Sequence, residues 1–256
     1  MQGSVIATNH FAVPGIASRY AAGRPYVHHV AGSEILRRCG HVSAAVDIGS
    51  GTGLSARALL GGAEAVVGVD PSVEMLSAAF RHASIRYVAG EAEQLPLASD
   101  SFDLATMGSA FHWCDRQATL VEFERVLRRG GSIAIYDIEL TGLAESPALI
   151  DWLRSGYWAG LPRCPHNGAF DVRLHVRRPF TLVTNMTLRA EAPMTIDALV
   201  SFILSQASSI NAVTTGAASF AALEASLRDG LARHVPPVAA ATARFDVPFT
   251  LLRKVA

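Results

Sequence analysis

The stretch that decides the fold is Val46-Asp47-Ile48-Gly49-Ser50-Gly51-Thr52-Gly53, an apolar run that ends in three alternating glycines. Glycine lets the chain turn sharply and lets a ligand lie directly on the backbone, because no side chain stands in the way. The chain continues as an expected helix over Ser55–Leu60, whose first N–H groups are available to a carboxylate or phosphate. The third glycine comes one residue earlier than in the Gly-x-Gly-x-x-Gly turn that binds dinucleotides. This spacing favours a ligand without a pyrophosphate.

Asp70 is the second fixed point, because it ends the next apolar run, Ala65–Val69. An acid at the end of the second strand can accept hydrogen bonds from both hydroxyls of a ribose. The alternative is that Asp70 merely caps a helix starting at Pro71, since Asp before Pro is a good helix opening. Together with the glycine turn, the ribose role is the better interpretation, and capping is compatible with it.

Between Ser43 and Asp137, short apolar runs alternate with amphipathic ones, which is the pattern of successive strand–helix units on a parallel sheet. Five strands are expected, at Ala44–Ile48, Ala65–Val69, Ile85–Val88, Phe102–Met107 and Ser132–Tyr136. The helices expected between them are Ser55–Leu60, Val73–Arg81 and Ala118–Arg129, the last with Leu120, Phe123, Val126 and Leu127 on one face.

The flanks of this region are less regular. A helix is expected over Val27–Arg38, and after Asp137 the alternation stops. Further helices are expected over Ser146–Tyr157, Thr195–Gln206 and Ala217–Arg233, with a late strand over Phe245–Arg253. We therefore divide the chain into an N-terminal lid on the substrate side (1–42), a ligand-binding core (43–137), a substrate cap insertion (138–240) and the final strand of the core sheet (241–256).

The composition limits the classes of partner. Twenty-two basic residues balance twenty-two acidic ones, so no basic stripe is available for a phosphate backbone and a nucleic-acid partner is not expected. The apolar stretches fall short of the ~18 residues that a membrane-spanning helix needs, so membrane insertion is not expected. Cys39, Cys114 and Cys164 show neither zinc-ligand nor disulfide spacing, and no metal site is expected. With no secretory signal at Met1–His10, these features predict a cytoplasmic protein.

Several motifs together resemble the class I, Rossmann-like S-adenosylmethionine-dependent methyltransferases, and in particular the ubiquinone/menaquinone-type and trans-aconitate-type group. The motifs are Asp47–Gly53, Gly68–Ser72, Gly90–Pro96 and Ser101–Asp103, followed by Phe111-His112-Trp113 with Asp115, and preceded by Tyr20 with Arg24-Pro25-Tyr26. The resemblance implies an α/β fold with a doubly wound, mostly parallel seven-stranded sheet and an antiparallel late strand. A small helical or irregular substrate cap would complete it.

The resemblance also implies a role for each matching residue. Gly49, Gly51 and Gly53 would line the methionine part of S-adenosyl-L-methionine, and Asp47 would hold its ammonium group. Asp70 would bind the ribose hydroxyls, and Glu91 and Ala92 would lie beside the adenine, with Glu91 standing where the family more often has Asp. Ser109 and Ala110 would approach the sulfonium side. The remaining residues of the implied cofactor site are Tyr20, Ser50, Pro71 and Met75.

His112 is the candidate general base, because it titrates near neutrality and follows the fourth expected strand. A base is needed only where the acceptor must lose a proton, since transfer to an already nucleophilic atom requires only correct positioning. The alternative is that His112 and Trp113 are packing residues that wall the cofactor site, and this is the interpretation we favour from sequence. Less favoured bases are His10, His28, His29, His166 and Asp115.

Aromatic residues in the expected cap are candidates for an acceptor site. Trp152, Tyr157, Trp158 and Phe170 could wall an apolar acceptor, with Trp113 and Tyr26 from the core side. The alternative for the cap residues is that they form the core of the cap itself. Arg163, Arg173 and Arg177 could bind a substrate carboxylate, although arginines on a lid are more often solvated.

The leading hypothesis is therefore methyl transfer to an oxygen, nitrogen or carbon atom of a small molecule, such as a secondary metabolite. A binding protein, or an enzyme that keeps the cofactor without methylating, would use the same glycine turn. A nicotinamide-dependent dehydrogenase is disfavoured by the glycine spacing and by a single lysine, Lys254, in the whole chain. The sequence predicts no oligomeric state.

Overall fold

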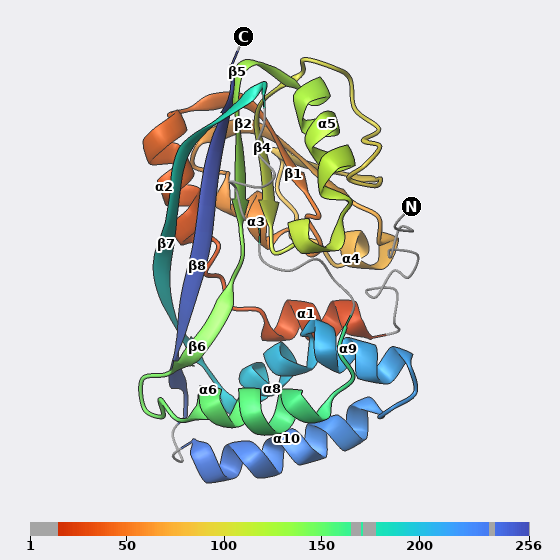
Figure 1. Ribbon diagram of the computed structural model, residues 1–256, viewed down its shortest axis with the longest axis vertical. Helices are drawn as coiled ribbons and strands as arrows, with labels where there is room; N and C mark the ends of the chain where they lie inside the picture. Colours follow the sequence, from red (N-terminus) through yellow and green to blue (C-terminus); the bar gives the residue numbers. More distant parts are fainter. Residues whose placement is uncertain (1–14, 165–169, 171–177, 236–238, 256) are drawn as a thin grey trace.

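One mixed eight-stranded sheet organises the structure, with helices on both faces and a helical layer below one end (Figure 1). The computed structural model describes residues 15–164, 170, 178–235 and 239–255. The strand order is β3-β2-β1-β4-β5-β8-β6, and β7 pairs with β8. The α/β fold class predicted from the sequence, a mostly parallel sheet with an antiparallel late strand, is confirmed.

Five strands of the sheet are parallel and carry the first half of the chain. They are β1 (Val42–Ile48), β2 (Ala63–Asp70), β3 (Ile85–Ala89), β4 (Phe102–Gly108) and β5 (Leu127–Tyr136). The chain runs outward from β1 through β2 to β3, then returns to the other side of β1 as β4. The order therefore reverses between β1 and β4, and ligands of open α/β sheets bind at the carboxyl ends of the strands at such a point.

Three strands complete the sheet on the β5 side. The late strand β8 (Ala241–Lys254) is antiparallel to β5, to the short strand β6 (Glu139–Leu143) and to β7 (Phe180–Met194). The sequence predicts a cap insertion over 138–240, but β7 within it is a fifteen-residue strand of the sheet. Its sequence carries no clear strand signal because most of its side chains are exposed, so the pairing with β8 determines its conformation.

Two helical layers bury the two faces of the sheet. On one face, α2 (His29–Cys39) and α3 (Leu54–Ala58) contribute to a cluster that contains Ile35, Ala56 and Phe249. On the other face, α5 (Arg116–Val126) places Phe123 and Val126 in a second cluster. The apolar face predicted for this helix is correct, but the helix ends at Val126 because β5 begins at Leu127. The short helix α4 (Val73–Ser77) follows β2.

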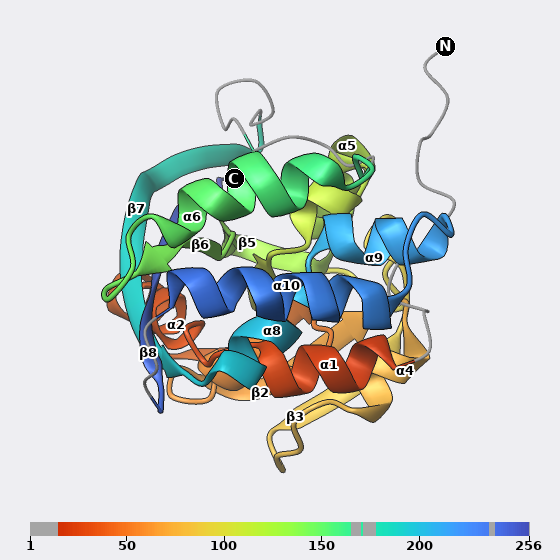
Figure 2. The same ribbon diagram turned by 90° about the horizontal axis from the view of Figure 1, so that it is seen from below.

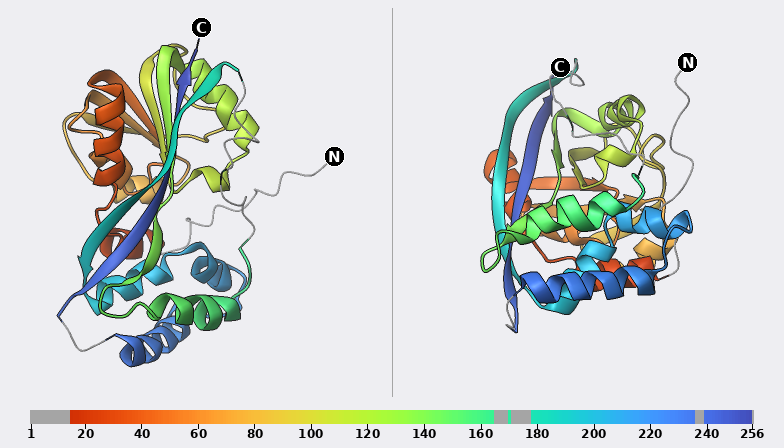
Figure 3. Two further views of the ribbon diagram at one scale, coloured as in Figure 1. Left: turned by 60° about the vertical axis from the view of Figure 1, so that its left-hand side comes forward. Right: turned by 60° about the horizontal axis from the view of Figure 1, so that its bottom comes forward.

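A separate apolar cluster builds the helical layer below the carboxyl end of the sheet, which we call the cap (Figures 2 and 3). It contains α1 (Ile16–Gly23), α6 (Leu149–Trp152), α8 (Ile196–Leu204), α9 (Ala207–Thr214) and α10 (Phe220–His234). The turns η3 (Leu153–Tyr157) and η4 (Trp158–Gly160) extend α6. The sequence predicts the cap and three of these helices, but it predicts neither α1 nor α9. Within residues 1–42, α1 packs against α8 and belongs to the same layer as the cap helices, whereas α2 lies on the sheet.

No single helix in the described part of the chain is long and apolar enough to span a membrane. The pair α8 and α9 meets that test by length and composition when the two are joined, although they are bent by 61° at their junction. In this structure Leu199, Phe202 and Ile203 of α8 are buried in the cap cluster.

The only lysine of the chain joins the late strand to the end of α5. Lys254 Nζ donates to the backbone oxygens of Leu127 (2.6 Å) and Glu124 (2.7 Å), and lies 3.5 Å from Asp100 Oδ1. A cation at a helix C-terminus satisfies the unpaired carbonyls and interacts favourably with the helix dipole. Lys254 therefore secures the α5–β5 junction to β8.

Replacing Lys254 by Met should lower the free energy of unfolding by about 1–3 kcal/mol, because two carbonyl oxygens lose their charged donor. Urea unfolding at neutral pH measures this change. Arg253→Met is the matched control, since it removes an exposed cation from the neighbouring position of β8 and should cost far less. Equal losses in the two variants would contradict the role assigned to Lys254.

Candidate functional site

The glycine turn lies at the carboxyl end of β1, beside the point where the strand order reverses. Gly49, Gly51 and Gly53 have φ values of 67°, 51° and 80°, in the left-handed region that favours glycine. A Cβ atom on Gly49 would lie 2.4 Å from the Cβ of Ala110, so the turn and the segment after β4 meet closely. The N–H of Gly49 donates to Val69 O at 2.8 Å, which ties the turn to the end of β2.

Two hydroxyl groups of the turn are buried without a partner. Ser50 is 4% exposed and Thr52 is 5% exposed, and in the structure as described Ser50 Oγ and Thr52 Oγ1 make no hydrogen bond. Buried polar groups are usually paired, so an orphaned hydroxyl indicates a missing ligand or water. Two such hydroxyls between the three glycines fit a polar ligand that lies along this turn.

Asp70 connects the turn to the second strand. Its Oδ2 accepts from Gly51 N at 2.8 Å and its Oδ1 accepts from Ser72 N at 2.9 Å, while 8% of the residue stays exposed. Burial raises the pKa of Asp70, hydrogen bonds from Ser72 and Gly51 lower it, and the charge of Glu91 raises it. Each carboxylate oxygen has a second lone pair, so the group can still accept from a ligand hydroxyl.

The alternative that Asp70 caps a helix starting at Pro71 is wrong in that form. The helix α4 begins at Val73, and its cap is Ser72, whose Oγ accepts from Met75 N at 3.2 Å. Pro71 is exposed next to the site. Met75 is 3% exposed and packs under the turn, because a Cβ on Gly51 would lie 3.2 Å from its Cε.

Asp47 lies directly below the turn with no exposed surface. Its carboxylate accepts from Ser55 Oγ at 2.5 Å and from Thr106 Oγ1 at 2.7 Å, which joins β1 to α3 and β4. Burial raises the pKa of Asp47 to about 7, although both hydrogen bonds lower it. Asp47 has no surface for a direct contact, so the ammonium contact implied by the family resemblance stays a prediction.

Glu91 and Ala92 follow β3, next to Asp70. The N–H of Gly90 donates to Asp70 O at 3.2 Å, and Glu91 is exposed while Ala92 is 7% exposed. Ala92 and Ala110 belong to the same buried apolar cluster. Ala92, expected near the adenine, and Ala110, expected near the sulfonium, therefore both pack into the apolar cluster on the same face of the sheet.

Ser109 ends β4 in a conformation that is unusual for a residue with a side chain. Its φ is 54°, its Oγ accepts from Ile138 N at 3.1 Å, and its N–H donates to Tyr136 O at 2.8 Å. A left-handed non-glycine residue costs about 1–3 kcal/mol, and such residues cluster at functional sites. These two hydrogen bonds hold Ser109 in its strained backbone conformation at the end of β4.

His112 is paired with an acid that the sequence analysis did not select. Its Nδ1 lies 3.3 Å from Asp137 Oδ1, and both side chains are partly exposed. The rings of His112 and Trp113 lie 5.1 Å apart in one short turn, η2 (Phe111–Trp113). Asp137 directly follows the fifth expected strand, and that position was the available signal. Asp115, a less favoured base, is instead the N-cap of α5.

The N-terminal segment reaches both layers of the molecule. The Arg24 guanidinium lies between the rings of Tyr20 (4.4 Å) and Phe202 (4.8 Å), which joins α1 to α8 of the cap. Tyr26 lies against α3 instead, with the Arg57 guanidinium 4.1 Å from its ring centre. Tyr20 therefore packs beside the cap, whereas Tyr26 packs against the helix that follows the glycine turn. Their expected contacts with cofactor or substrate stay predictions.

Of the other candidate bases, His28 is buried and its Nδ1 lies 2.9 Å from Tyr136 Oη. Burial, with the charges of Arg24 and His29, lowers the pKa of His28 to about 3, which makes it a poor base at neutral pH. His29 is exposed, and its Nδ1 bonds to Tyr26 O. His10, His166, Arg173 and Arg177 lie outside the described residues.

The aromatic residues expected in the cap divide between the cap cluster, which holds Trp152, Tyr157 and Trp158, and the sheet-side cluster, against which Phe170 packs. Trp152 stacks on His234 at 5.1 Å between ring centres, and Tyr157 is 8% exposed with its Oη 3.5 Å from Ser209 Oγ. Both therefore fit the alternative that they form the core of the cap. Trp158 differs, since its buried Nε1 has no hydrogen-bond partner in the structure as described. Phe170 makes an edge contact with Phe111 at 4.9 Å.

Among the described residues, no group of three or more His, Cys, Asp or Glu side chains is arranged to hold a metal ion. The polar side chains around the glycine turn include the acids Asp47, Asp70 and Glu91 and the hydroxyls of Ser50 and Thr52. This set fits an organic ligand with hydroxyl and cationic groups.

Comparison with known proteins identifies the domain that carries this turn. Residues 46–135 match the family model of a methyltransferase domain. An uncharacterized methyltransferase of Mycobacterium tuberculosis is 39% identical over 92 residues, which are 35% of this chain and 37% of that protein. Malonyl-[acyl-carrier protein] O-methyltransferase of Enterobacter lignolyticus is 32% identical over 162 residues, 59% of this chain and 61% of that protein. Demethylmenaquinone methyltransferase of Corynebacterium kroppenstedtii is 38% identical over 91 residues, 35% of this chain and 39% of that protein. The chain thus matches less than two thirds of the length of each of these relatives.

A solved structure extends the likeness of the fold beyond that domain. A protein of Anaeromyxobacter dehalogenans assigned as a type II methyltransferase superposes with a TM-score of 0.67 at 22% identity. The superposition covers 89% of this chain and 96% of that one. At this identity the likeness shows a common fold. Residues 46–135 therefore belong to the methyltransferase-domain family, on the class I, Rossmann-like fold that the sequence motifs indicated.

Proposed function

We propose that this chain is an S-adenosylmethionine-dependent methyltransferase that acts on a small molecule. The observation that carries the proposal is the glycine turn, in which Asp70 holds Gly51 and two buried hydroxyls lack a partner. Gly49, Gly51 and Gly53 have positive φ values, which favour glycine. The absence of a Cβ atom at these residues also lets the turn pack closely against its protein neighbours. A ligand with a ribose and a cationic amino acid end fits the acids and hydroxyls that gather there.

The residues present suit the cofactor part by part. The Gly49–Gly53 turn, with Ser50 and Thr52, would hold the methionine end. Asp70 would accept from the ribose hydroxyls with the lone pairs that the backbone leaves available. Glu91 and Ala92 would flank the adenine, while Ser109 and Ala110 would face the sulfur.

In this reaction the protein contributes mainly by positioning the reacting groups, because the methyl group is already activated by the cofactor. When bound, S-adenosylmethionine supplies a methyl group that is activated by a positively charged sulfur. The strained turn at Ser109 and the close contact of Gly49 with Ala110 fix the backbone where the acceptor would approach. Correct alignment of the reacting groups can supply several orders of magnitude in rate.

A small-molecule acceptor is supported by the cap and by the charge balance. The cap lies below the carboxyl end of the sheet, where it can cover an acceptor and exclude water (Figure 3). Equal numbers of basic and acidic residues give the chain no net positive charge that would attract nucleic acid. The names of two relatives refer to different acceptors. One name refers to a malonyl group on an acyl-carrier protein and the other to demethylmenaquinone.

Binding tests the proposal directly. S-adenosylhomocysteine should bind with micromolar affinity by calorimetry, and NAD and NADP should not. Asp70→Ala should weaken binding by roughly 1.5–3 kcal/mol, the scale of hydrogen bonds to a charged group. Asp70→Asn keeps one acceptor oxygen and should fall between wild type and the Ala variant.

The controls for this experiment distinguish a loss of ligand binding from a loss of folded structure. Far-UV circular dichroism should show that both Asp70 variants stay folded. Tight binding of NAD without a heat signal for S-adenosylhomocysteine would overturn the assignment of the cofactor. If Asp70→Ala binds S-adenosylhomocysteine as tightly as wild type, Asp70 does not bind the ligand and serves only to hold the glycine turn.

The pH dependence of binding tests Asp47. Its carboxyl has a pKa of about 7 in the structure, so it is partly protonated at neutral pH. A cationic ammonium nearby favours the ionised form, so binding should release a proton below that pKa. The affinity for S-adenosylhomocysteine should therefore rise with pH up to about 7, by at most about tenfold per pH unit, and then level off.

Asp47→Asn is the matched variant, because Asn fills the same space without titrating. This variant should lose most of the pH dependence between pH 5 and 7, while the remaining groups of the site still titrate. Calorimetry in two buffers of different ionisation enthalpy counts the released protons. The same proton release in wild type and Asp47→Asn would remove Asp47 from ammonium binding.

The His112–Asp137 pair supports a role for His112 as base toward an acceptor that must lose a proton. A carboxylate beside the imidazole holds the ring and stabilises its protonated form. Once an acceptor is identified, His112→Gln should lower kcat by about 10²-fold with little change in cofactor affinity. Asp137→Asn should lower kcat in the same direction by less.

The competing interpretation of His112 as a wall residue gives a different result. In that case His112→Gln would lower kcat only modestly and would weaken cofactor binding alongside. Asp115→Asn is the control, because Asp115 caps α5 and should change stability more than kcat. An unchanged pH profile of kcat in His112→Gln would also exclude the base role.

A further inference from the structure

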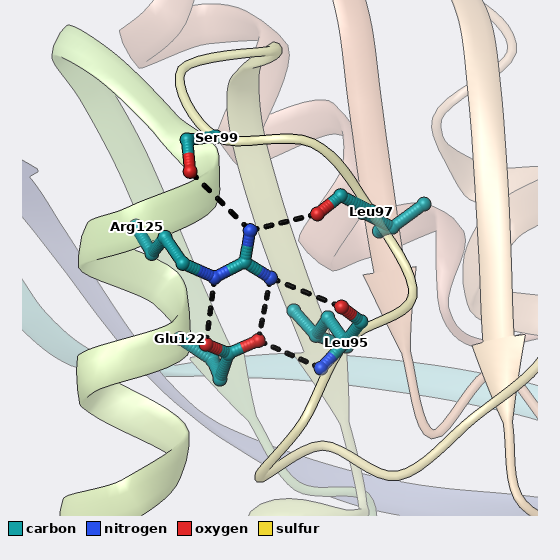
Figure 4. Close-up of polar contacts among 5 residues, drawn as sticks. All are labelled: Leu95, Leu97, Ser99, Glu122 and Arg125. Carbon is teal, nitrogen blue, oxygen red and sulfur yellow. Dashed lines mark hydrogen bonds and ion pairs between the residues drawn. The ribbon is translucent and has the colours of Figure 1, made fainter.

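Two side chains of α5 hold the segment that follows β3, residues 90–99, which we call the adenine-side segment (Figure 4). Arg125 forms a two-point ion pair with Glu122, with Nε–Oε1 at 2.8 Å and Nη2–Oε2 at 2.7 Å. The same guanidinium donates to Leu97 O at 2.7 Å, Leu95 O at 3.0 Å and Ser99 Oγ at 3.4 Å. Glu122 Oε2 also accepts from Leu95 N at 2.7 Å, so both polar groups of Leu95 are bound by α5.

The segment depends on these contacts because it has little regular structure of its own. Its internal backbone hydrogen bonds are Gln94 N to Glu91 O at 3.3 Å and Leu97 N to Leu95 O at 2.8 Å. Leu95 is 4% exposed and packs in the same apolar cluster as Ala92 and Ala110. A displacement of Leu95 would therefore also displace Ala92, which lies three residues away in the chain and packs in the same cluster.

The start of α5 provides a second attachment. Glu93 Oε1 accepts from Asp115 N at 2.7 Å, while Gly90 N donates to Asp70 O at 3.2 Å. Glu91 and Ala92 thus lie between an attachment to the end of β2 and attachments to α5. Neither Glu122 nor Arg125 belongs to the proposed cofactor site itself.

Each partner of the ion pair stabilises the charged form of the other, and the guanidinium of Arg125 donates to several acceptors at once. The hydrogen bond from Arg125 lowers the pKa of Glu122, with a further contribution from the Leu95 N–H, and the Glu122 carboxylate raises the pKa of Arg125. A guanidinium offers five donors in a rigid plane, whereas a lysine ammonium offers three on a flexible stem. Lysine should therefore be a poor replacement at position 125.

We infer that Glu122 and Arg125 are positioning residues that set the affinity and the base selectivity at the adenine end of the cofactor site. They act by fixing the backbone of the adenine-side segment, which carries Glu91 and Ala92. This inference rests on the proposed function, since it takes those two residues to flank the adenine. Reading the edge of a purine needs backbone and side-chain groups held in place, and α5 supplies that support.

The experiment compares two ligands that differ only at the purine edge, S-adenosylhomocysteine and S-inosylhomocysteine. Dissociation constants are measured by calorimetry for wild type, Arg125→Met, Arg125→Lys and Glu122→Gln, at a temperature well below every unfolding midpoint. Arg129→Met is the control, because it removes an exposed arginine from the same region of the chain. Hydrogen exchange of the Leu95 amide is followed without ligand as an independent measure of the segment.

Arg125→Met should weaken S-adenosylhomocysteine binding by roughly tenfold, the scale of positions coupled to a site through packing and hydrogen bonds. The preference for the adenosyl over the inosyl ligand should shrink by a similar factor, and the Leu95 amide should exchange faster. Arg125→Lys should resemble Arg125→Met, Glu122→Gln should lie between them and wild type, and Arg129→Met should match wild type.

A lower unfolding midpoint with unchanged affinity and unchanged adenosyl preference in Arg125→Met would overturn the inference and leave the pair a purely structural support. An equal loss for both ligands would also overturn the selectivity role. If wild type itself fails to bind S-adenosylhomocysteine, the proposed function fails first. The two failures are therefore separated by the wild-type titration.

Discussion

The rest of the site depends on the bond between a buried carboxylate and a backbone N–H. Asp70, at the end of β2, accepts from Gly51 in the middle of the turn that ends β1. The parallel pairing of Ile48 with Val69 brings the two strand ends together, and the bond then fixes the turn against them. Because the turn has left-handed backbone at three glycines, it needs such an external tie to keep one conformation.

The electrostatics of the site follow from the burial of its acids. Burial raises the pKa of both Asp47 and Asp70, and the negative charge of Asp70 adds to the effect at Asp47. Groups whose charged form is disfavoured by burial gain most from a nearby cation. A ligand that carries an ammonium and a sulfonium group supplies that charge, and this agrees with the polar hydroxyls that the turn leaves without partners. Perturbed acids in a crevice are a physical reason to place function there.

The two layers of the molecule divide the work of the proposed reaction. In that proposal the sheet and its end loops would hold the ligand through Asp70, the glycine turn and the segment fixed by Glu122 and Arg125. The cap is a second apolar body joined to the sheet by the long strands β7 and β8 (Figure 3). Its aromatic residues Trp152 and Tyr157 pack within the cap itself, so fewer cap aromatics stay candidates for an acceptor site than the sequence suggested.

The sequence by itself determined the parts that local chemistry controls. Left-handed turns need glycine, buried parallel strands are apolar runs, and an acid after β2 marks a binding edge, so Gly49–Gly53 and Asp70 could be recognised without coordinates. Only the tertiary structure decided the parts that depend on distant partners. The strand β7 exists because it pairs with β8, whose residues lie between 47 (Met194 with Ala241) and 74 (Phe180 with Lys254) positions later in the chain. Asp137 reaches His112 because β5 pairs with β4, and Arg125 reaches Leu95 because α5 packs beside the segment after β3. Local sequence patterns do not encode these contacts.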